Sequence, residues 1–463
     1  MVDSLLRPRK RRRRRGLVPA LFLTGLAVVA FWLFRGGTAQ PTGSLQGVPE
    51  VLGEKETISL TLEAPHAGLA VWQLYIRDAR GNRFVLAEEN LPAGGLFEPG
   101  TQRIQREVEI APRELGLAEG TAELILQATG HAPLSRLGGG DPITQTPFTV
   151  DLTPPDLRVL SGPHRILQGG TDLMVYQTGK DAVRSGVLVG QTEFPGSPGP
   201  FTDGERWVSL YSVPWNAPGD LNAAVYTEDA AGNRQTRRVP LAIRKRKPRA
   251  EEIRISDNFI RTKIEPLLTR YQQPIPETPT EAYLAVNRAM RQESEKELQA
   301  LLAESAPQLL TTRALQQQRG TQVGSRFAEH RTYTYQGDAI DEQTHLGYDL
   351  ASVRRAPVKA AGDGQVQWVG ELGIYGKIVL IDHGLGLATL YAHLSQIDVE
   401  PGMQIARGEV LGRSGESGLA GGDHIHFSVT LRGHHVDPLE WWDAQWVKRE
   451  ILEPIQQAGA QGP

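Results

Sequence analysis

The chain has 463 residues, which is too long for one hydrophobic core, so we expect about three domains. It contains no cysteine, which excludes disulfides and thiolate metal sites, so any metal must be held by His, Asp or Glu. The formal net charge is -3, but residues 1–16 hold eight Lys/Arg and one acid and sum to +7, so the remainder sums to -10. An acidic body excludes a general nucleic-acid-binding surface.

The N-terminus has the pattern of a membrane anchor. A basic run from Arg7 to Arg15 precedes an apolar run from Leu17 to Phe34. At about 1.5 Å per residue, such a helix would reach about 27 Å, close to the roughly 30 Å of a bilayer core. Because positive charge stays on the cytoplasmic side, we predict a cytoplasmic basic tail and a transmembrane anchor in residues 1–40. A cleaved signal peptide and a nucleic-acid-binding arm are the alternatives.

Residues 41–150 and 151–245 have the pattern of two β-sandwich modules. Thr57–Leu62 alternates, and strands recur at about ten-residue spacing with turn residues between them. Pro154 and Pro155 mark the boundary, because paired prolines break strand pairing. The Thr-Pro-Pro start and the Asp-Ala-Ala-Gly-Asn turn at 229–233 resemble bacterial immunoglobulin-like modules. We favour a spacer role, with binding of the cell wall or of protein partners as the alternative.

Residues 246–320 are predicted to form a helical connector. Thr278, Pro279 and Glu281 have the spacing of a capping box, which predicts a helix from there to about Glu304. Its apolar stripe is expected to pack against a neighbouring domain, with a partner helix as the alternative. Pro266 should bend or shorten the preceding helix. Residues 446–463 are expected to be a C-terminal tail.

Histidines and one aspartate concentrate in the C-terminal part. From His424 to Thr430 the sequence alternates, so His424 and His426 should project from the face opposite to Ile425 and Phe427. The segment around His393 alternates in the same way. His345 and Asp349 are four residues apart, a spacing that brings two side chains to one face of a strand or of a helix. Glycine-rich turns between apolar strands predict an antiparallel β domain over residues 321–445.

These pieces, in this order, resemble the lysostaphin/LytM-type zinc metallopeptidase family, whose members are peptidoglycan endopeptidases. The resemblance covers about residues 323–442. It is carried by motifs that share the family's order: His345-Leu-Gly-Tyr-Asp349, Ala360-Ala-Gly-Asp-Gly364, Tyr391-Ala-His-Leu-Ser395, Gly408-Glu-Val-Leu-Gly412 and His424-Ile-His-Phe427. The chain departs from the family at Phe327-Ala-Glu-His-Arg331, at Asp423 and at Ser428, and we expect these departures to affect specificity.

The resemblance implies a set of site residues. His345, Asp349 and His426 would be the Zn²⁺ ligands, and His393 and His424 the catalytic histidines. The other histidines of the domain, His383 and His330 among them, are expected to be structural.

The resemblance also implies a function and a location. We expect a mainly β chain with a transmembrane helix, two immunoglobulin-like modules, a helical connector and a metallopeptidase domain. It would hydrolyse peptide bonds in the stem peptides or cross-bridges of peptidoglycan, in the periplasm or extracytoplasmic space of a bacterium, while held in the inner membrane by a single pass. A non-catalytic activator or scaffold of a separate cell-wall hydrolase is the alternative. A lipoyl-like carrier is disfavoured, because no lysine occupies the turn that such a carrier modifies.

Overall fold

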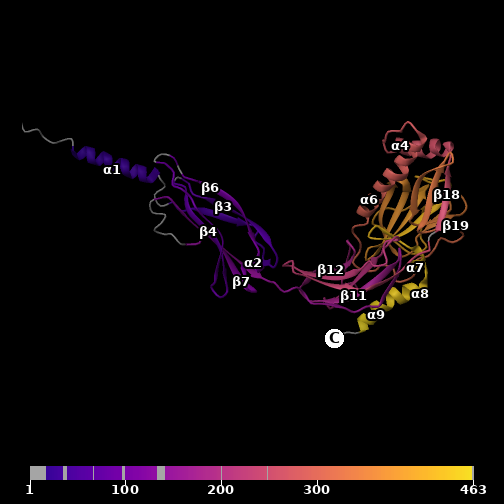
Figure 1. Cartoon of the computed structure of the whole chain (residues 1–463), viewed down its shortest axis with the longest axis horizontal. Helices are drawn as coiled ribbons and strands as arrows, with labels where there is room; N and C mark the ends of the chain where they lie inside the picture. Colours follow the sequence, from indigo (N-terminus) through magenta and orange to yellow (C-terminus); the bar gives the residue numbers. More distant parts are fainter. Residues whose placement is uncertain are drawn as a thin grey trace, which may run out of the picture. The chain divides into compact units, whose positions relative to one another are not determined.

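The computed structural model describes residues 17–34, 39–65, 67–95, 98, 100–132, 141–199, 201–247 and 249–460. The chain divides into two compact units, one of Met1–Thr153 and Ala230–Asn233, the other of Pro154–Asp229 and Arg234–Pro463 (Figure 1). Both units are mainly β, as expected. The basic run from Arg7 to Arg15 lies outside the described residues.

The apolar run near the N-terminus forms helix α1 (Leu17–Phe34). In the part of the chain that the structure describes, no helix combines the length and the apolar character that a membrane crossing requires. The transmembrane anchor therefore stays a prediction.

The first unit contains a two-sheet sandwich. One sheet has the strand order β1-β3-β6 and the other β2-β8-β7-β4-β5. Alternate residues of both sheets share one core, and Ile58, Leu60 and Leu62 are buried in it, as the alternation predicts. The elements of this unit are β1 (Thr42–Gln46), β2 (Val51–Leu52), β3 (Glu56–Glu63), β4 (Leu69–Asp78), β5 (Arg83–Asn90), β6 (Arg103–Ile110), α2 (Pro112–Leu115), β7 (Gly120–Gly130) and β8 (Thr144–Val150).

The second unit begins with another β module. Its sheets have the orders β14-β11-β9 and β13-β12-β15-β16, and β10 pairs with β17. The strands are β9 (Leu157–Val159), β10 (His164–Leu167), β11 (Thr171–Thr178), β12 (Ala182–Val189), β13 (Thr192–Pro195), β14 (Arg206–Ser212), β15 (Ala223–Asp229), β16 (Arg234–Val239) and β17 (Leu241–Arg244). This module is not an independent domain, because its buried apolar residues and those of the C-terminal domain form one continuous hydrophobic core.

The connector begins with a strand that the sequence analysis did not predict. Strand β18 (Arg249–Ile255) pairs in parallel with β20 (Glu329–Tyr335), which pairs with β21 (Asp338–His345). The predicted capping box is confirmed, since the Thr278 hydroxyl accepts from the Glu281 N–H and the Glu281 carboxylate accepts from the Thr278 N–H. Pro266 closely follows the π-helical turn η1 within a helical run from Asp257 to Arg270, so the proline changes the helix type without ending the helix. The helices are α3 (Asp257–Phe259), η1 (Ile260–Ile264), α4 (Glu265–Arg270), α5 (Pro279–Leu284), η2 (Ala285–Met290) and α6 (Arg291–Leu301).

The C-terminal domain is built on an eight-stranded antiparallel sheet. Its strand order is β19-β22-β30-β26-β25-β24-β28, with β31 paired to β30. These strands are β19 (Gln322–Ser325), β22 (Tyr348–Ala351), β24 (Gly364–Leu372), β25 (Gly376–Gly384), β26 (Leu387–Leu394), β28 (Gln404–Ile405), β30 (Ile425–Leu431) and β31 (His434–Val436). A smaller sheet joins β23 (Pro357–Lys359), β29 (Val410–Arg413) and β27 (Gln396–Ile397).

The large sheet is covered on both faces, which is why β26 and β30 are buried along their whole length. On one face the connector helices bury Tyr283, Val286 and Leu298 against sheet residues, so the predicted packing of the apolar stripe is confirmed (Figure 1). On the other face Phe427 and Val429 join the core that includes the second β module.

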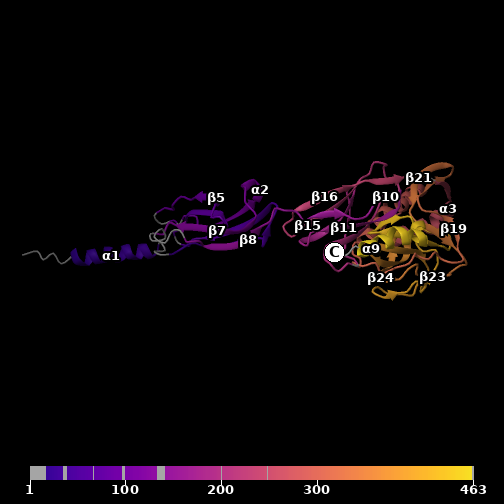
Figure 2. The same ribbon diagram turned by 90° about the horizontal axis from the view of Figure 1, so that it is seen from below.

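The chain ends in helices that pack against the second unit's own β module. They are α7 (Pro438–Trp442), α8 (Ala444–Trp446), η4 (Val447–Leu452) and α9 (Glu453–Ala460). Val447 and Ile451 are buried in the shared core, and Arg206 of β14 donates to the Ala458 carbonyl. Helix α9 lies beside β11 of that module (Figure 2). Residues 444–460 are therefore an integrated part of the unit.

Candidate metal centre and cleft

Three neighbouring strands carry the predicted site residues. Asp349 in β22 lies directly opposite His426 in β30, and His426 lies opposite Ala392, the residue before His393, in β26. His424 comes just before β30, and His345 is the last residue of β21. The structure thus brings all five predicted residues together.

His345 and Asp349 do not share one strand or helix, although their spacing allows either. Leu346 and Gly347 separate the two strands that carry them. A Cβ on Gly347 would lie 2.6 Å from His426 Cε1, so only glycine fits beside that ring.

Three ligand atoms form a close triangle. His345 Nε2, Asp349 Oδ1 and His426 Nδ1 are each 3.0 Å from the other two. The opposite ring nitrogens are bonded elsewhere: His345 Nδ1 is 3.0 Å from the Arg326 carbonyl, and His426 Nε2 is 2.9 Å from the Ser428 hydroxyl, which itself donates to Leu346 O at 2.8 Å. When those outer nitrogens carry the protons, the lone pairs of the two inner ring nitrogens and of the Asp349 oxygen point toward one position.

Three converging lone pairs repel one another unless a cation lies between them. Two imidazoles and one carboxylate at these separations match one face of a tetrahedron with bonds of about 2 Å, the geometry that Zn²⁺ takes with these ligands. The donor set therefore fits a divalent metal with an open fourth position.

The two remaining histidines lie beside this triangle. The rings of His393 and His424 have centroids 4.8 Å apart, and His424 Nε2 is 3.6 Å from Asp349 Oδ1. Their Nδ1 atoms donate to the carbonyls of Ser417 and Gly422, each at 2.8 Å, so the Nε2 atom of each ring is the one that can exchange a proton, and in His424 this atom faces Asp349. His393 has a φ of 61°, a left-handed backbone that few residues other than glycine adopt.

The protonation of these groups follows from their surroundings. Burial, followed by the charges of His424 and His426, holds the pKa of His393 well below its ordinary value, so this ring is neutral at pH 7. Burial lowers the pKa of His426 to about 4. Burial also opposes a charged His424, but the hydrogen bond and the charge of Asp349 outweigh it and raise the pKa of His424. Burial disfavours the Asp349 carboxylate, but its bonds to His345, His424 and His426 keep the pKa of Asp349 well below the usual range.

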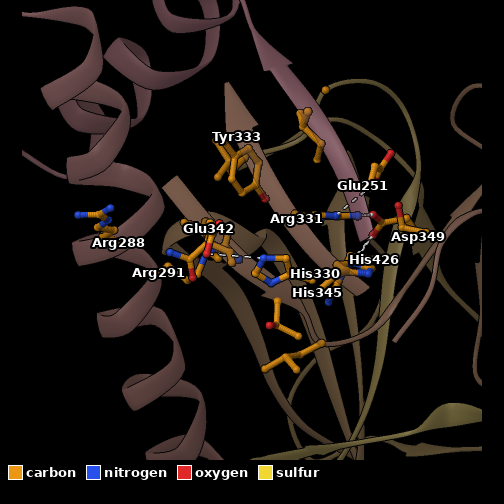
Figure 3. Close-up of a pocket in the computed structure, with 18 of the residues that line it drawn as sticks. Glu251, Arg288, Arg291, His330, Arg331, Tyr333, Glu342, His345, Asp349 and His426 are labelled. Atoms are coloured by element: carbon orange, nitrogen blue, oxygen red, sulfur yellow. Dashed lines mark hydrogen bonds and ion pairs between the residues drawn. The ribbon is translucent and has the colours of Figure 1, made fainter. Parts of the chain in front are cut away.

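A cleft of about 870 Å³ opens over the triangle. Its walls come from elements far apart in the sequence, including Trp215 of the second β module, Glu251 of β18 and Arg291 of α6 (Figure 3). His330, expected to be structural, lines this cleft and lies 3.7 Å from Glu342.

The remaining histidines and the departures from the family pattern have structural contacts. His383 is buried, with Nε2 2.9 Å from the Thr389 hydroxyl, as expected for a structural residue. Asp423 accepts from the Ser414 hydroxyl at 2.6 Å and from the Arg355 N–H at 3.0 Å. Ser428 is fully buried against His426, so it does not lie on the surface of the cleft, and its effect on specificity stays a prediction.

Arg331 is a site residue whose role the sequence analysis missed. Its Nη2 donates to Asp349 Oδ2 at 2.8 Å, and its Nε lies 3.5 Å from Glu251 Oε2 (Figure 3). Burial disfavours its charge, but the Asp349 carboxylate outweighs this and raises the pKa of Arg331. The available signal was its place in Phe327-Ala-Glu-His-Arg331, where an arginine is part of the family pattern.

Comparison with known proteins gives a family match that lies within the C-terminal domain. The sequence model of Peptidase family M23 matches residues 343–438. DD-carboxypeptidase/endopeptidase Mpg of Neisseria meningitidis is 39% identical over 95 residues, which are 20% of this chain and 22% of that protein. Peptidoglycan DD-endopeptidase ShyA of Vibrio cholerae is 36% identical over 96 residues, 21% of this chain and 22% of the relative. The chain thus spans about a fifth of the length of these curated relatives.

Among solved structures, a putative peptidase M23 from Pseudomonas aeruginosa is 24% identical. The match covers 60% of this chain and 95% of that one, with a TM-score of 0.38, which is too low to carry a conclusion.

Proposed function

Because residues 343–438 form a Peptidase family M23 domain, we propose that the chain is a zinc metalloendopeptidase that hydrolyses peptide bonds in peptidoglycan. The observation that carries the proposal is the triangle of His345 Nε2, Asp349 Oδ1 and His426 Nδ1, each 3.0 Å from the other two, at the base of a cleft. The curated relatives named as peptidoglycan endopeptidases support the substrate class.

His345, Asp349 and His426 would hold the Zn²⁺, which acts as a Lewis acid toward the scissile carbonyl when bound. His393 and His424 then supply proton transfer. Each ring holds its Nδ1 on a backbone carbonyl, so its Nε2 can accept a proton from the attacking water and return it to the leaving amine. The imidazolium that results can also stabilise the developing oxyanion.

The test uses the full chain and purified muropeptides read by mass spectrometry. The zinc-loaded chain should cleave a cross-linked muropeptide, and a chelator should stop the cleavage. His345→Ala should lose both the metal and the activity. His330→Ala serves as the control, because that histidine lines the same cleft with its side chain 44% exposed and outside the triangle. Cleavage that survives in His345→Ala would contradict the proposal.

The alternative is an activator of another hydrolase. It would be supported if the zinc-loaded chain cleaved no muropeptide but increased the rate of a separate wall amidase. The complete ligand set argues against it, since a chain with only a scaffold role has no need of three converging lone pairs.

We also propose that residues 1–40 anchor the chain in the inner membrane, with the C-terminal domain outside the cytoplasm. The proposal is supported by the basic run before Leu17 and the helical, apolar segment Leu17–Phe34. Carbonate extraction of membranes, followed by protease treatment of spheroplasts, tests it. Release of the chain by carbonate, or its protection from the protease, would count against it.

A further inference from the structure

One wall of the cleft lies outside the M23-matched residues. Arg288, Arg291 and Glu295 line it from η2 and α6, and the triangle lies at its base (Figure 3). The same cleft thus contains a metal site and a row of charged side chains on a helix. The charges on that helix decide what part of a substrate could bind there.

Two of the three side chains have hydrogen-bonded partners of opposite or polar character. Arg288 Nε lies 2.7 Å from Asp341 Oδ1. Glu295 Oε2 lies 2.9 Å from His435 Nε2, and its other oxygen accepts from the Tyr375 hydroxyl. Burial opposes a charged Glu295, but His435, these hydrogen bonds and the charge of Arg291 lower the pKa of Glu295 to about 2, so this carboxylate stays ionised.

Arg291 is different, because its partners are neutral. Its Nε donates to the Asn287 carbonyl at 3.1 Å and its Nη2 donates to Asn287 Oδ1 at 2.7 Å. No carboxylate among the described residues lies within 4.0 Å of its nitrogens, since Arg291 takes part in none of the ion pairs there. Arg291 therefore has no carboxylate in direct contact, although Glu295, one helical turn along, is close enough for the two charges to interact.

The position of this guanidinium is fixed in advance. Asn287 is fully buried, and its Nδ2 donates to Asp341 Oδ2 at 2.7 Å, which orients its Oδ1 toward Arg291. Two donors of Arg291 are thus used to hold the group in place, and the Nη1 donors remain. A preorganised guanidinium loses less entropy when it binds a ligand.

Glu342 is a further carboxylate that lines the cleft. Its side chain is 65% exposed, and its Oε2 lies 3.7 Å from His330 Nε2 (Figure 3). It forms no ion pair with Arg291 within 4.0 Å among the described residues.

We propose that Arg291 binds a carboxylate of the peptide substrate, away from the scissile bond, and so selects substrates that carry one there. The inference rests on the proposed peptidase function and adds a specificity-determining residue to it. A guanidinium recognises a carboxylate through charge-assisted hydrogen bonds, which are stronger and more directional than neutral ones. The carboxylate can belong to the peptide's C-terminus or to a side chain, and substrates that differ at one group only distinguish these sources.

The experiment compares three forms of one cross-linked muropeptide with the full zinc-loaded chain. One form has its carboxyl groups free, one has the C-terminal carboxyl amidated, and one has the side-chain carboxyl amidated. The wild-type chain should have a KM about 10-fold to 100-fold lower for the free form than for one of the amides, with kcat changed less. The amidated form that binds more weakly shows which carboxyl group of the substrate Arg291 recognises.

The Arg291→Gln variant should lose this preference and treat the free and amidated forms alike. Arg291→Lys should keep part of it, since lysine retains the charge but not the two bonds to Asn287. Gln292→Ala is the matched control, because Gln292 is an uncharged cleft-lining neighbour on the same helix, and it should keep the full preference. A preference unchanged in Arg291→Gln, or absent from the wild type, would overturn the inference.

A failure of the proposed peptidase function can be distinguished from a failure of the inference about Arg291. If the wild-type chain cleaves none of the three forms, calorimetry of the same peptides with the metal-free chain repeats the comparison as binding. Tighter binding of the free form that is lost in Arg291→Gln would keep the carboxylate site while the peptidase proposal fails. Equal binding of all three forms would contradict the carboxylate site as well as the peptidase function.

Discussion

The Arg331 guanidinium donates to one oxygen of Asp349, and the other oxygen of that carboxylate faces the histidines. The Nη2–Oδ2 distance is 2.8 Å, whereas Oδ1 lies 3.0 Å from both His345 Nε2 and His426 Nδ1. Arg331 therefore fixes the rotation of the carboxylate and leaves a single oxygen facing the two histidines, where the proposed metal would bind. Glu251, reached through the parallel pairing of β18 with β20, lies 3.5 Å from Arg331 Nε.

The first prediction concerns Arg331→Gln. Removing the guanidinium should free the Asp349 carboxylate to rotate and should weaken zinc binding by about 10-fold to 100-fold, the usual effect of losing a group that orients a metal ligand. Competition with a chromophoric chelator measures the affinity. Arg270→Lys, a change in an exposed ion pair with Glu371, should bind zinc as the wild type does. Wild-type affinity in Arg331→Gln would show that the ligands orient Asp349 without help.

The second prediction concerns His393→Asn. Asparagine tolerates the left-handed backbone at this position, so the fold should persist while the proton-accepting ring is lost. Cleavage should fall by about 10²-fold to 10⁴-fold, the range expected for a general acid–base group, and the zinc content should stay at one per chain. Rates of muropeptide cleavage and metal analysis of the same sample check both parts. A variant that retained half of the wild-type rate would remove His393 from the catalytic set.

The third prediction concerns the packing of the second β module on the C-terminal domain. Arg246 Nη2 lies 2.6 Å from Asp437 Oδ2, whose side chain is 2% exposed, and Arg246 Nε also donates to the Gln168 carbonyl at 3.2 Å. Arg246→Ala should lower the free energy of unfolding by about 3 kcal/mol or more, because it leaves a buried carboxylate without its partner.

Adding Asp437→Asn to Arg246→Ala should recover part of that loss, since the uncompensated charge disappears. Denaturant unfolding of the single and double variants measures this, with Arg238→Ala on an exposed strand position as the control. If the double variant were less stable than the single one, the charge would not be the cause.

The fourth prediction is a pH dependence. Burial raises the pKa of Glu440 from 4.5 to about 8, with the Asp437 and Asp172 carboxylates adding to the shift, although the Thr171 N–H donates to it at 2.8 Å. Between pH 4.5 and 8 the folded chain therefore holds a proton that the unfolded chain has released. Stability should fall as the pH rises through this window, by up to about 1.4 kcal/mol per pH unit.

Glu440→Gln should flatten this dependence, because the amide does not ionise. Unfolding midpoints at pH 5.5 and pH 8, compared between the variant and the wild type, measure the difference. Glu297→Gln, an exposed position on α6, should leave the wild-type slope unchanged. Parallel slopes for Glu440→Gln and the wild type would contradict the prediction.

The family resemblance supplied the five site residues, and local alternation predicted only that the side chains of His424 and His426 share a face. The alternation from His424 to Thr430 is confirmed by the pairing of β30 with both β22 and β26, which brings Asp349 and His393 beside His426. Alternation is informative here because side chains of paired strands point alternately to the two faces of the sheet. When the apolar residues of each strand face the core, the polar residues of neighbouring strands come together on the other face.

What the sequence did not predict depends on contacts between distant segments. Glu251 and Arg331 are 80 residues apart and meet only because β18 pairs with β20. Trp215 lines the cleft because the second β module packs on the C-terminal domain, whereas its strand pattern alone favoured a spacer. No local periodicity encodes such pairings, so the walls of the cleft remained outside the prediction.

The parallel pairing of β18 with β20 also decides where the peptidase could be cut for grafting onto another protein. A fragment of residues 321–463 would contain all five histidine and aspartate site residues but not Arg249–Ile255, so β20 would become a bare edge. Exposed strand edges recruit other strands, and such a fragment should therefore tend to self-associate. A transplant that starts at Pro154 would carry the covering strand, the helical wall and the docked module together.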